Sequence, residues 1–306
     1  MNFSKYSGLG NDFILVDNRD GHFPSGDQEL IRRLCHRRFG IGADGIILLE
    51  RSQIAQAKMR IFNADGSEAE MCGNGLRCFM QFLLELGFAE GKYAVETLND
   101  VLTCKHTEGE VWVKMSEPSN VCWSVELGKI EVHSLNTGVP HAVHFTADLE
   151  KTPLEELGPY VRRHPFFGPE GTNFTVAQVI GEGRLKFRTF ERGVEGETYA
   201  CGTGACAAAL AYAHTFQRRA PVVVETMTGG MLLIEFEEKN GLFSSVSMQG
   251  PATFVFNGSA PLSEELHRVM ISAKKETNGQ QIKRPSGSEK SSDSTLHTHD
   301  GSVCQV

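Results

Sequence analysis

Two cysteines open glycine-rich turns that lead into apolar stretches of helical pattern. Cys72 begins Cys-Gly-Asn-Gly, and Cys201 begins Cys-Gly-Thr-Gly 129 residues later. At a helix start, N–H groups without intrahelical partners and the helix dipole favour negative charge, so a thiol there is poised to form a thiolate. Two thiols facing one cleft can remove a proton from one side of a carbon and deliver another from the opposite side. This pattern predicts a racemase or epimerase that works without a cofactor.

The segments that must position these cysteines recur along the chain. Val95-Glu96-Thr97 returns as Val224-Glu225-Thr226 at the spacing of the two cysteines. Gly10-Asn11-Asp12-Phe13 is matched by Gly138-Val139-Pro140-His141 at nearly the same spacing. A repeat of two long units indicates duplicated domains.

The pattern predicts two homologous halves, residues 1–118 and 119–257, and residues 258–273 are expected to join the first half. The segment 262–273 has the pattern of a final amphipathic helix. Residues 277–306 are rich in Ser, Gly, Lys, Asp and His, which predicts a disordered polar tail.

Each half is predicted to contain short strands around one central helix. The helix after Cys72 carries apolar residues on nearly every face and is expected to stop at Gly87; its counterpart is expected from Gly204 to about Phe216. Helices of this kind lie inside a protein. We therefore expect an α/β (α+β) fold of two pseudosymmetric domains, each a mostly antiparallel sheet wrapped around a buried helix, with the active site in the cleft between them. Four apolar segments are expected to be strands: 46–49, 111–113, 222–224 and 232–234.

The composition of the chain limits the classes of molecule that we expect it to bind. The chain has 306 residues, a net charge of −8 and 40% hydrophobic residues, which is typical of a globular protein and not of a nucleic-acid or membrane-surface binder. No apolar run approaches the ~20 residues of a membrane span, and the start lacks a signal-peptide pattern, so the cytoplasm is expected. Eight cysteines, without zinc-type spacing, are too dilute for a disulfide scaffold and are expected to be free thiols.

Long segments around both cysteines resemble the active-site signatures of the diaminopimelate epimerase family. The two signatures are Asn63-Ala64-Asp65-Gly66-Ser67-Glu68-Ala69-Glu70-Met71-Cys72-Gly73-Asn74-Gly75-Leu76-Arg77-Cys78, and Glu191-Arg192-Gly193 followed by Glu197-Thr198-Tyr199-Ala200-Cys201-Gly202-Thr203-Gly204-Ala205-Cys206. The further matching segments are Gly8-Leu9-Gly10-Asn11-Asp12-Phe13, Arg38-Phe39-Gly40-Ile41-Gly42-Ala43-Asp44-Gly45 and Glu170-Gly171-Thr172-Asn173. The resemblance runs from about residue 3 to 272.

The resemblance implies a pyridoxal-independent isomerase without any cofactor or metal. It would interconvert LL- and meso-2,6-diaminopimelate, an amino-acid substrate, in lysine and peptidoglycan-precursor biosynthesis. The implied mechanism is two-base transfer between a thiolate and a thiol, and the implied assembly is a homodimer.

The resemblance also assigns roles to residues at matching positions. Cys72 and Cys201 match the two catalytic thiols, and His141 and Glu191 match polar partners of the reacting amine and thiols. The positions that match substrate-binding residues are Asn11, Asn63, Gly73, Asn74, Asn173, Glu191, Arg192, Gly202 and Thr203. Among these, Arg192 is suited to a bidentate grip on the distal carboxylate. Cys78 and Cys206, inside the helices, are expected to be packing residues.

Two departures from the family pattern concern the far end of the substrate. Val139 stands where the family often has asparagine, and Gly45 stands where some members carry glutamine. Three other functions therefore stay open. One is a related two-cysteine racemase acting on glutamate, histidine, proline or hydroxyproline; another is an amino-acid-binding protein without catalysis. A third is a redox protein, in which oxidation would join Cys72 to Cys201 if they lie within disulfide reach.

Overall fold

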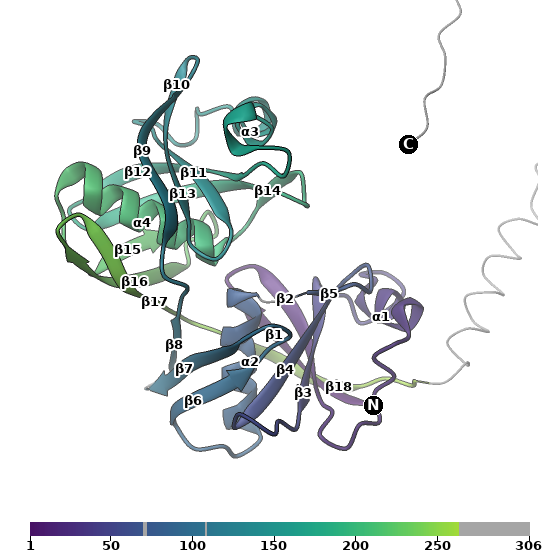
Figure 1. Cartoon of the computed structure of the whole chain (residues 1–306). Coiled ribbons are helices and arrows are strands. Elements are labelled where there is room, and N and C mark those ends of the chain that lie inside the picture. The colour runs from purple at the N-terminus through teal and green to yellow at the C-terminus, as the bar shows by residue number, and fades with distance from the viewer. Residues whose placement is uncertain (70–71, 108, 263–306) are drawn as a thin grey trace, which may run out of the picture. The chain divides into compact units, whose positions relative to one another are not determined.

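A computed structural model describes residues 1–69, 72–107 and 109–262 of the chain (Figure 1). Residues 1–260 form one compact unit. Of a second unit, 261–306, only the first two residues are described. The expected tail at 277–306 and most of the expected final helix at 262–273 lie outside the described residues.

The described strands fall into two sets, which we call the first and the second lobe. The first lobe holds β1 (Asn2–Gly8), β2 (Asn11–Asp17), β3 (Gly45–Glu50), β4 (Ala57–Asn63), β5 (Glu68–Ala69), β6 (Gly91–Glu96), β7 (Val101–Thr107), β8 (Glu110–Lys114) and, from the end of the chain, β18 (Thr253–Ser259). The second lobe holds β9 (Ser119–Leu127), β10 (Ile130–Asn136), β11 (Pro140–Phe145), β12 (Asn173–Gly181), β13 (Arg184–Glu191), β14 (Gly196–Thr198), β15 (Val222–Glu225), β16 (Met231–Lys239) and β17 (Leu242–Gly250).

The two lobes share one order of strand pairing. In the first, β2 and β3 are parallel, as are β4 and β6, and the remaining pairs are antiparallel. In the second, β11–β12 and β13–β15 are the parallel pairs. Even the register is repeated, because Phe13 lies opposite Gly45 as His141 lies opposite Asn173. The expected mostly antiparallel, duplicated fold is confirmed.

One long helix fills each lobe. In Figure 1, α2 (Gly73–Glu85) lies among the first-lobe strands and α4 (Gly202–Phe216) among those of the second. Nearly the whole of α4 is buried, which suits its alanine-rich sequence. The shorter helices α1 (Gln28–Cys35) and α3 (Leu154–Arg162), with the 3₁₀ turn η1 (Pro165–Phe167), occupy the crossovers before β3 and β12.

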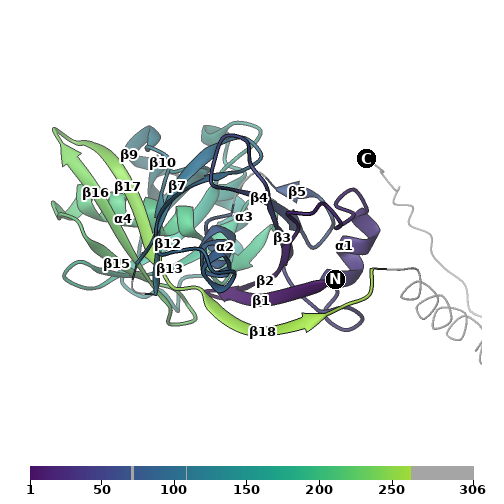
Figure 2. The same ribbon diagram turned by 90° about the horizontal axis from the view of Figure 1, so that it is seen from below.

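The lobes are joined by strand pairing and not only by the chain. β17 of the second lobe pairs antiparallel with β8 of the first, with Met248 opposite Val113. After β17 the chain returns to the first lobe, where β18 pairs with β1 at the edge shown in Figure 2. The domain boundaries expected near 118 and 257 stay a prediction.

The four predicted strands all form, within β3, β8, β15 and β16. The predicted helices needed small corrections. α2 ends at Glu85 instead of at Gly87, because Leu86 is its C-cap and Gly87 turns out of the helix with a φ of 87°. α4 begins at Gly202, two residues before the predicted start, because Cys201 already serves as its N-cap.

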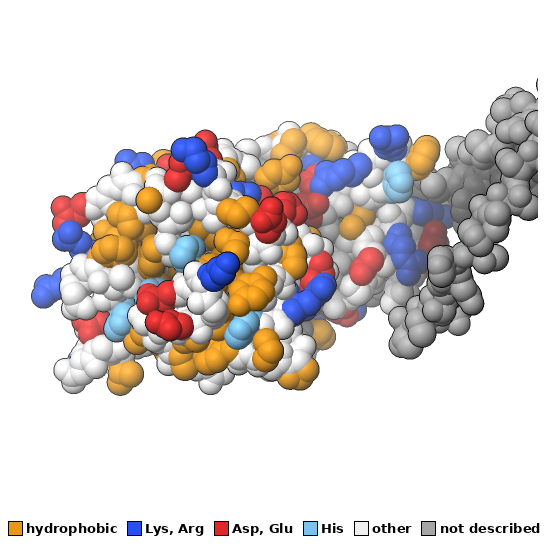
Figure 3. Space-filling view, turned by 90° about the horizontal axis from the view of Figure 1, so that it is seen from above, with side chains coloured by type: hydrophobic (Ala, Val, Ile, Leu, Met, Phe, Trp, Pro, Cys, Tyr) orange, Lys and Arg blue, Asp and Glu red, His pale blue; other side chains and the backbone are white. Residues whose placement is uncertain are grey.

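The surface is mixed in charge on the face drawn in Figure 3, where Lys and Arg side chains are interspersed with Asp and Glu. Within the described ranges, none of the helices combines the length and the apolar character needed to cross a membrane.

Candidate functional site

Cys72 occupies the N-cap of α2. Its backbone is extended (φ −143°, ψ 116°), and its Sγ accepts a hydrogen bond from Gly75 N at 3.4 Å. The thiol is half-buried. The second glycine of the turn is tightly packed, because a Cβ on Gly75 would lie 3.0 Å from Ile47 Cδ1 and from Ile61 Cδ1.

Cys201 occupies the same place at α4, with a φ of −123° and a ψ of 106°. It is buried, and its Sγ lies 3.4 Å from Thr203 Oγ1. The glycine that corresponds to Gly75 is Gly204, where a Cβ would lie 3.0 Å from Thr189 Oγ1 and 3.2 Å from both His141 Cε1 and Thr175 Oγ1. The second turn therefore rests on polar side chains where the first rests on isoleucines.

The two helix starts converge on Met248 of β17. A Cβ on Gly73 would lie 3.1 Å from Met248 Cε, and a Cβ on Gly202 would lie 3.0 Å from the same atom. Any larger residue at either glycine would press on this methyl group. The strand that joins the lobes thus brings the two Cys-Gly turns to one place.

The thiols differ in their electrostatic surroundings. Burial raises the pKa of Cys72, while N–H groups of Gly75 and Asn74 and the buried Arg77 guanidinium act to lower it. Burial raises the pKa of Cys201 well above its ordinary value. Glu191, which is hydrogen-bonded to Cys201, raises that pKa further. Charge therefore favours the thiolate at Cys72 and the thiol at Cys201.

Glu191 itself is a largely buried carboxyl at the end of β13. Burial raises its pKa, against hydrogen bonds from Thr198 Oγ1 and Cys201 that lower it. Its charge also acts on Cys72, since Glu191 contributes to raising the Cys72 pKa. The structure therefore brings this sequence-predicted carboxyl to both thiols.

His141 is fully buried beneath the start of α4. Its Nε2 lies 2.9 Å from Thr203 Oγ1, and its Nδ1 lies 3.1 Å from Thr175 Oγ1. Thr175 Oγ1 lies in turn 3.1 Å from Thr189 Oγ1. Burial, together with the nearby Arg192 charge, lowers the His141 pKa from 6.5 to about 3, so the ring is neutral at physiological pH. Thr203 links this neutral imidazole to Cys201.

Asn74, held by Asn11, forms a bridge between the two lobes. Asn74 Nδ2 donates to Asn11 Oδ1 at 2.6 Å and to the carbonyl of Ala200, the residue before Cys201, at 3.1 Å. Arg77 Nη2 donates to Asn74 Oδ1 at 2.8 Å, and Asn11 Nδ2 donates to Asp44 at 3.2 Å. Both amides are thus engaged in holding one helix start against the other.

Asn173 joins Arg192 to His141. Its Oδ1 accepts from Arg192 N at 2.7 Å, and its Nδ2 lies 3.4 Å from His141 Nε2. The Arg192 guanidinium lies 3.7 Å from the exposed carboxylate of Glu170. Asn63 stands apart from this group, since its exposed side chain donates to Ser67 Oγ at 3.0 Å.

Gly45 and Val139, the two departures from the family pattern, lie in different surroundings. Gly45 packs so closely that a Cβ there would approach Phe62 O to 2.4 Å, and the longer side chain of some relatives does not fit this backbone. Val139 lies in the turn before β11, where its carbonyl accepts from Thr137 N at 3.2 Å.

Sequence reasoning missed several residues that the fold brings to this place. Thr175 and Thr189, the polar pair under α4, occupy the positions that Ile47 and Ile61 occupy in the first lobe. The spacing between the repeated segments could have identified them, because it relates Thr175 and Thr189 to Ile47 and Ile61. The place of Met248 could not be predicted from the sequence, because only the pairing of β17 with β8 brings it between the helices.

The cysteines outside this site behave as expected. The seven that are described are free, and Cys78 and Cys206 are buried packing residues. In the described part of the chain, no group of three or more His, Cys, Asp or Glu side chains could hold a metal ion.

Comparison with known proteins gives one consistent family. The profile described as "Diaminopimelate epimerase" matches residues 3–121 and 133–255. A protein of that name from Moorella thermoacetica is 43% identical over 284 residues, covering 86% of this chain and 100% of the relative. Another, from Flavobacterium psychrophilum, is 36% identical over 260 residues, covering 84% of this chain and 98% of the relative.

Solved structures agree in fold at much lower identity. A phenazine biosynthesis protein of the PhzF family from Bacillus anthracis superposes with a TM-score of 0.67 at 16% identity, covering 86% of this chain and 99% of its own. A probable proline racemase from Agrobacterium radiobacter has a TM-score of 0.62 at 16% identity, covering 86% and 93%. These likenesses establish a shared two-domain fold.

Proposed function

The chain belongs to the diaminopimelate epimerase family, whose named members are isomerases, and from this we propose that it interconverts LL- and meso-2,6-diaminopimelate with Cys72 and Cys201 as its two acid–base groups. The observation that carries the proposal is the pair of thiols on matched helix starts that meet at Met248. We infer that two thiols suffice for this chemistry and that no cofactor takes part.

The opposite charges around the thiols support a resting state with Cys72 as thiolate and Cys201 as thiol. In one direction the Cys72 thiolate takes the α-proton, and the electron pair of that C–H bond remains on the carbon. The carbon then takes the proton of the Cys201 thiol from the opposite face. Cys72 ends as thiol and Cys201 as thiolate, which is the form that the reverse direction requires.

The start of each helix supplies donors for the reacting carboxylate. Backbone N–H groups at the first helical positions, among them those of Gly73, Asn74, Gly202 and Thr203, have no acceptor within their own helix. Two helix dipoles pointing at one place favour an anion there. We propose that the α-carboxylate binds between these turns, where the donors also stabilise the charge that develops on proton removal.

We assign the remaining site residues to substrate orientation and to the protonation state. Glu191 favours protonated Cys201 and offers a carboxylate to the substrate ammonium, while neutral His141 holds Thr203 beside Cys201. Arg192 and Asn173 are proposed to bind the distal end of the substrate, as is Asn63. Asn11 is proposed to act through its bridge to Asn74. Val139 and Gly45 depart from the family pattern at positions expected to concern the distal end of the substrate. Family membership is therefore the ground on which we propose diaminopimelate, and not glutamate, histidine or proline, as the substrate.

Solvent deuterium exchange tests the reaction and the substrate together. The full chain is incubated under reducing conditions in D₂O, without added cofactor, with LL-diaminopimelate, glutamate, histidine or proline. Deuterium should enter the α-position of diaminopimelate while the meso isomer accumulates. Exchange into proline, glutamate or histidine alone would favour a related racemase, and binding without exchange would favour a non-catalytic protein.

We further propose a homodimer working in the cytoplasm, in lysine and peptidoglycan-precursor biosynthesis. The free thiols of the described residues suit a reducing compartment. The edge strand β18 supports self-association, because Phe254, Val255 and Phe256 are 44–51% exposed and β1 is its one partner in the described sheet. Sedimentation of the wild type as a dimer and of Val255→Lys as a monomer is expected; a monomeric wild type would contradict the assembly.

A further inference from the structure

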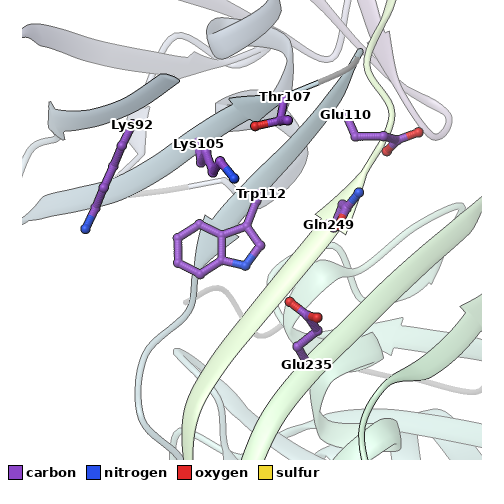
Figure 4. Close-up of a pocket in the computed structure, with 7 residues that line it drawn as sticks. All are labelled: Lys92, Lys105, Thr107, Glu110, Trp112, Glu235 and Gln249. Carbon is purple, nitrogen blue, oxygen red and sulfur yellow. The ribbon is translucent and has the colours of Figure 1, made fainter. Parts of the chain in front are cut away.

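A pocket lies on the outer face of the strands that join the lobes. It has a volume of about 530 Å³ and is lined by Lys92, Lys105, Thr107, Glu110, Trp112, Glu235 and Gln249 (Figure 4). Register places its central row on four neighbouring strands, because Lys92 lies opposite Lys105, Lys105 opposite Trp112, and Trp112 opposite Gln249. The row therefore runs across β6, β7, β8 and β17.

This pocket is separate from the candidate active site. Successive side chains of a strand point to opposite faces of the sheet, so Gln249 in the pocket and its neighbour Met248 face opposite ways. Met248 faces the two helix starts. Occupation of the pocket therefore leaves the space at the two thiols open.

The charges of the pocket are segregated. Lys92 and Lys105 lie on one side of the Trp112 ring in Figure 4, Glu235 lies on the other, and Glu110 lies beside Thr107, its partner across β7 and β8. In the ranges 1–69, 72–107 and 109–262, no hydrogen bond or ion pair is formed by any of these four charged side chains. Like charges directly opposite on neighbouring strands are destabilising, and Lys92 faces Lys105 in this way. An anion would relieve the facing lysines, and a cation would pair with Glu235.

We propose that this pocket binds an extended zwitterion, a molecule with a carboxylate at one end and an ammonium group at the other. The carboxylate would lie at Lys92 and Lys105, the ammonium group at Glu235, and the body against the Trp112 indole. Three inter-strand steps separate β7 from β16, so their backbones lie roughly 14 Å apart, and the ligand with its ion pair at each end spans this distance. That span exceeds the separation of the two charged groups on one α-carbon, and it suits an ω-amino acid or a short peptide.

Fluorine NMR on the full chain tests this proposal. The chain has two tryptophans, so labelling with 5-fluorotryptophan yields two resonances, and the Trp112→Phe variant assigns them. The probes are 6-aminohexanoate, hexanoate and hexylammonium, which carry both charges, the anion alone and the cation alone. We expect 6-aminohexanoate to shift the Trp112 resonance saturably. The absence of a saturable shift up to roughly 50 mM, a concentration far above ordinary ligand affinities, would overturn the proposal.

Matched variants show whether binding occurs in the pocket or elsewhere on the protein surface. Lys105→Ala and Glu235→Ala should each weaken binding of 6-aminohexanoate about fivefold, the size expected for one exposed ion pair. Lys114→Ala and Glu237→Ala, on the same strands as pocket residues but outside the lining, should leave binding unchanged. Equal affinity for hexanoate would show an anion site and overturn the zwitterion.

A short peptide, triglycine, distinguishes the two ligand sources, because tighter binding than 6-aminohexanoate would indicate a peptide. The proposal does not rest on the thiol chemistry. A Cys72→Ala/Cys201→Ala double variant should therefore bind the probe like the wild type. Loss of activity with retained binding in that variant would separate the two proposals.

Discussion

The starts of α2 and α4 have the same backbone and opposite surroundings. Beneath Gly75 lie Ile47 and Ile61, and beneath Gly204 lie Thr175 and Thr189 at the same register. Phe13 in the first lobe is replaced by His141 in the second by the same register. The duplicated fold thus supplies two equivalent thiol positions, and the side chains around them make the positions chemically unequal.

The charged side chains near the two thiols also differ between the lobes. The first turn has Arg77 in its helix, buried and hydrogen-bonded to Asn74, and this cation lowers the pKa of Cys72. The corresponding residue of α4 is Cys206, one of the buried packing thiols. The second turn has instead the carboxylate of Glu191, which raises the pKa of Cys201. The proposed inversion needs one acid and one base at any moment, and this asymmetry would provide them without breaking the fold symmetry.

The largest effect is expected from replacing either thiol. Cys72→Ser and Cys201→Ser should each lower kcat for interconversion of the two diaminopimelate isomers by about 10³-fold or more, because a hydroxyl is too weak an acid to take the thiol's place. Isomer separation by chromatography measures this. Cys122→Ser, at an exposed thiol on β9, is the control and should retain activity. Normal turnover in either active-site variant would remove that cysteine from the mechanism.

The next effect concerns the charge that separates the two thiols. Glu191→Gln removes the negative charge that raises the Cys201 pKa, so the thiolate should form at lower pH. A change of one pKa unit would speed alkylation of Cys201 by iodoacetamide at pH 8 about tenfold. Activity should fall about 10²-fold, because the acid–base pairing is lost.

Peptide mapping of the alkylated protein measures both thiols in one experiment. In the wild type, half-buried Cys72 should react before buried Cys201. Faster labelling of Cys201 in the wild type would reverse the assignment of the resting thiolate.

A third prediction exchanges the surfaces beneath the two helices. Ile47→Thr should cost roughly 2–3 kcal/mol of unfolding free energy, because it buries a hydroxyl among apolar side chains and removes packing. Thr175→Val, which keeps the shape, should cost about 1 kcal/mol by removing the contacts with His141 and Thr189. Urea unfolding measures both.

Thr175→Val should also change the pH dependence of kcat, because His141 loses the partner of its Nδ1. An unchanged pH profile would show that Thr175 only packs. Thr175→Ser keeps the hydroxyl and is expected to restore the wild-type profile.

The smallest effect is the pH dependence of stability that His141 contributes. His141 has a native pKa of about 3, below its ordinary 6.5, so between these values the unfolded chain binds a proton that the folded chain does not. Stability from this group is complete above pH 6.5 and falls as pH decreases, by about 1.4 kcal/mol per pH unit.

Urea unfolding at pH 6.0, 5.5 and 5.0 should show this slope in the wild type. His141→Asn should reduce the slope by that amount over the same range. Equal slopes in the two proteins would mean that His141 is protonated in the folded state or already neutral in the unfolded one.

The sequence by itself determined the two helix-start cysteines and the duplication. Two Cys-Gly-x-Gly turns with matched flanks identify paired helix-start thiols, and apolar patterns identify the strands and the buried helices. These are local signals, since a turn, a cap and a strand each depend on residues that are neighbours in the chain. The long signatures around the cysteines also indicated the family that the comparisons establish.

Only the tertiary structure decided how the two thiols differ. The carboxylate beside Cys201 comes from β13. The polar side chains beneath this cysteine, those of His141, Thr175 and Thr189, come from β11, β12 and β13. The methyl group between the two helix starts comes from β17. Burial and charge depend on which distant strands meet, and a pKa responds to those surroundings and not to spacing along the chain. The same holds for the outer pocket, whose charged rows exist because β6, β7, β8, β17 and β16 lie side by side.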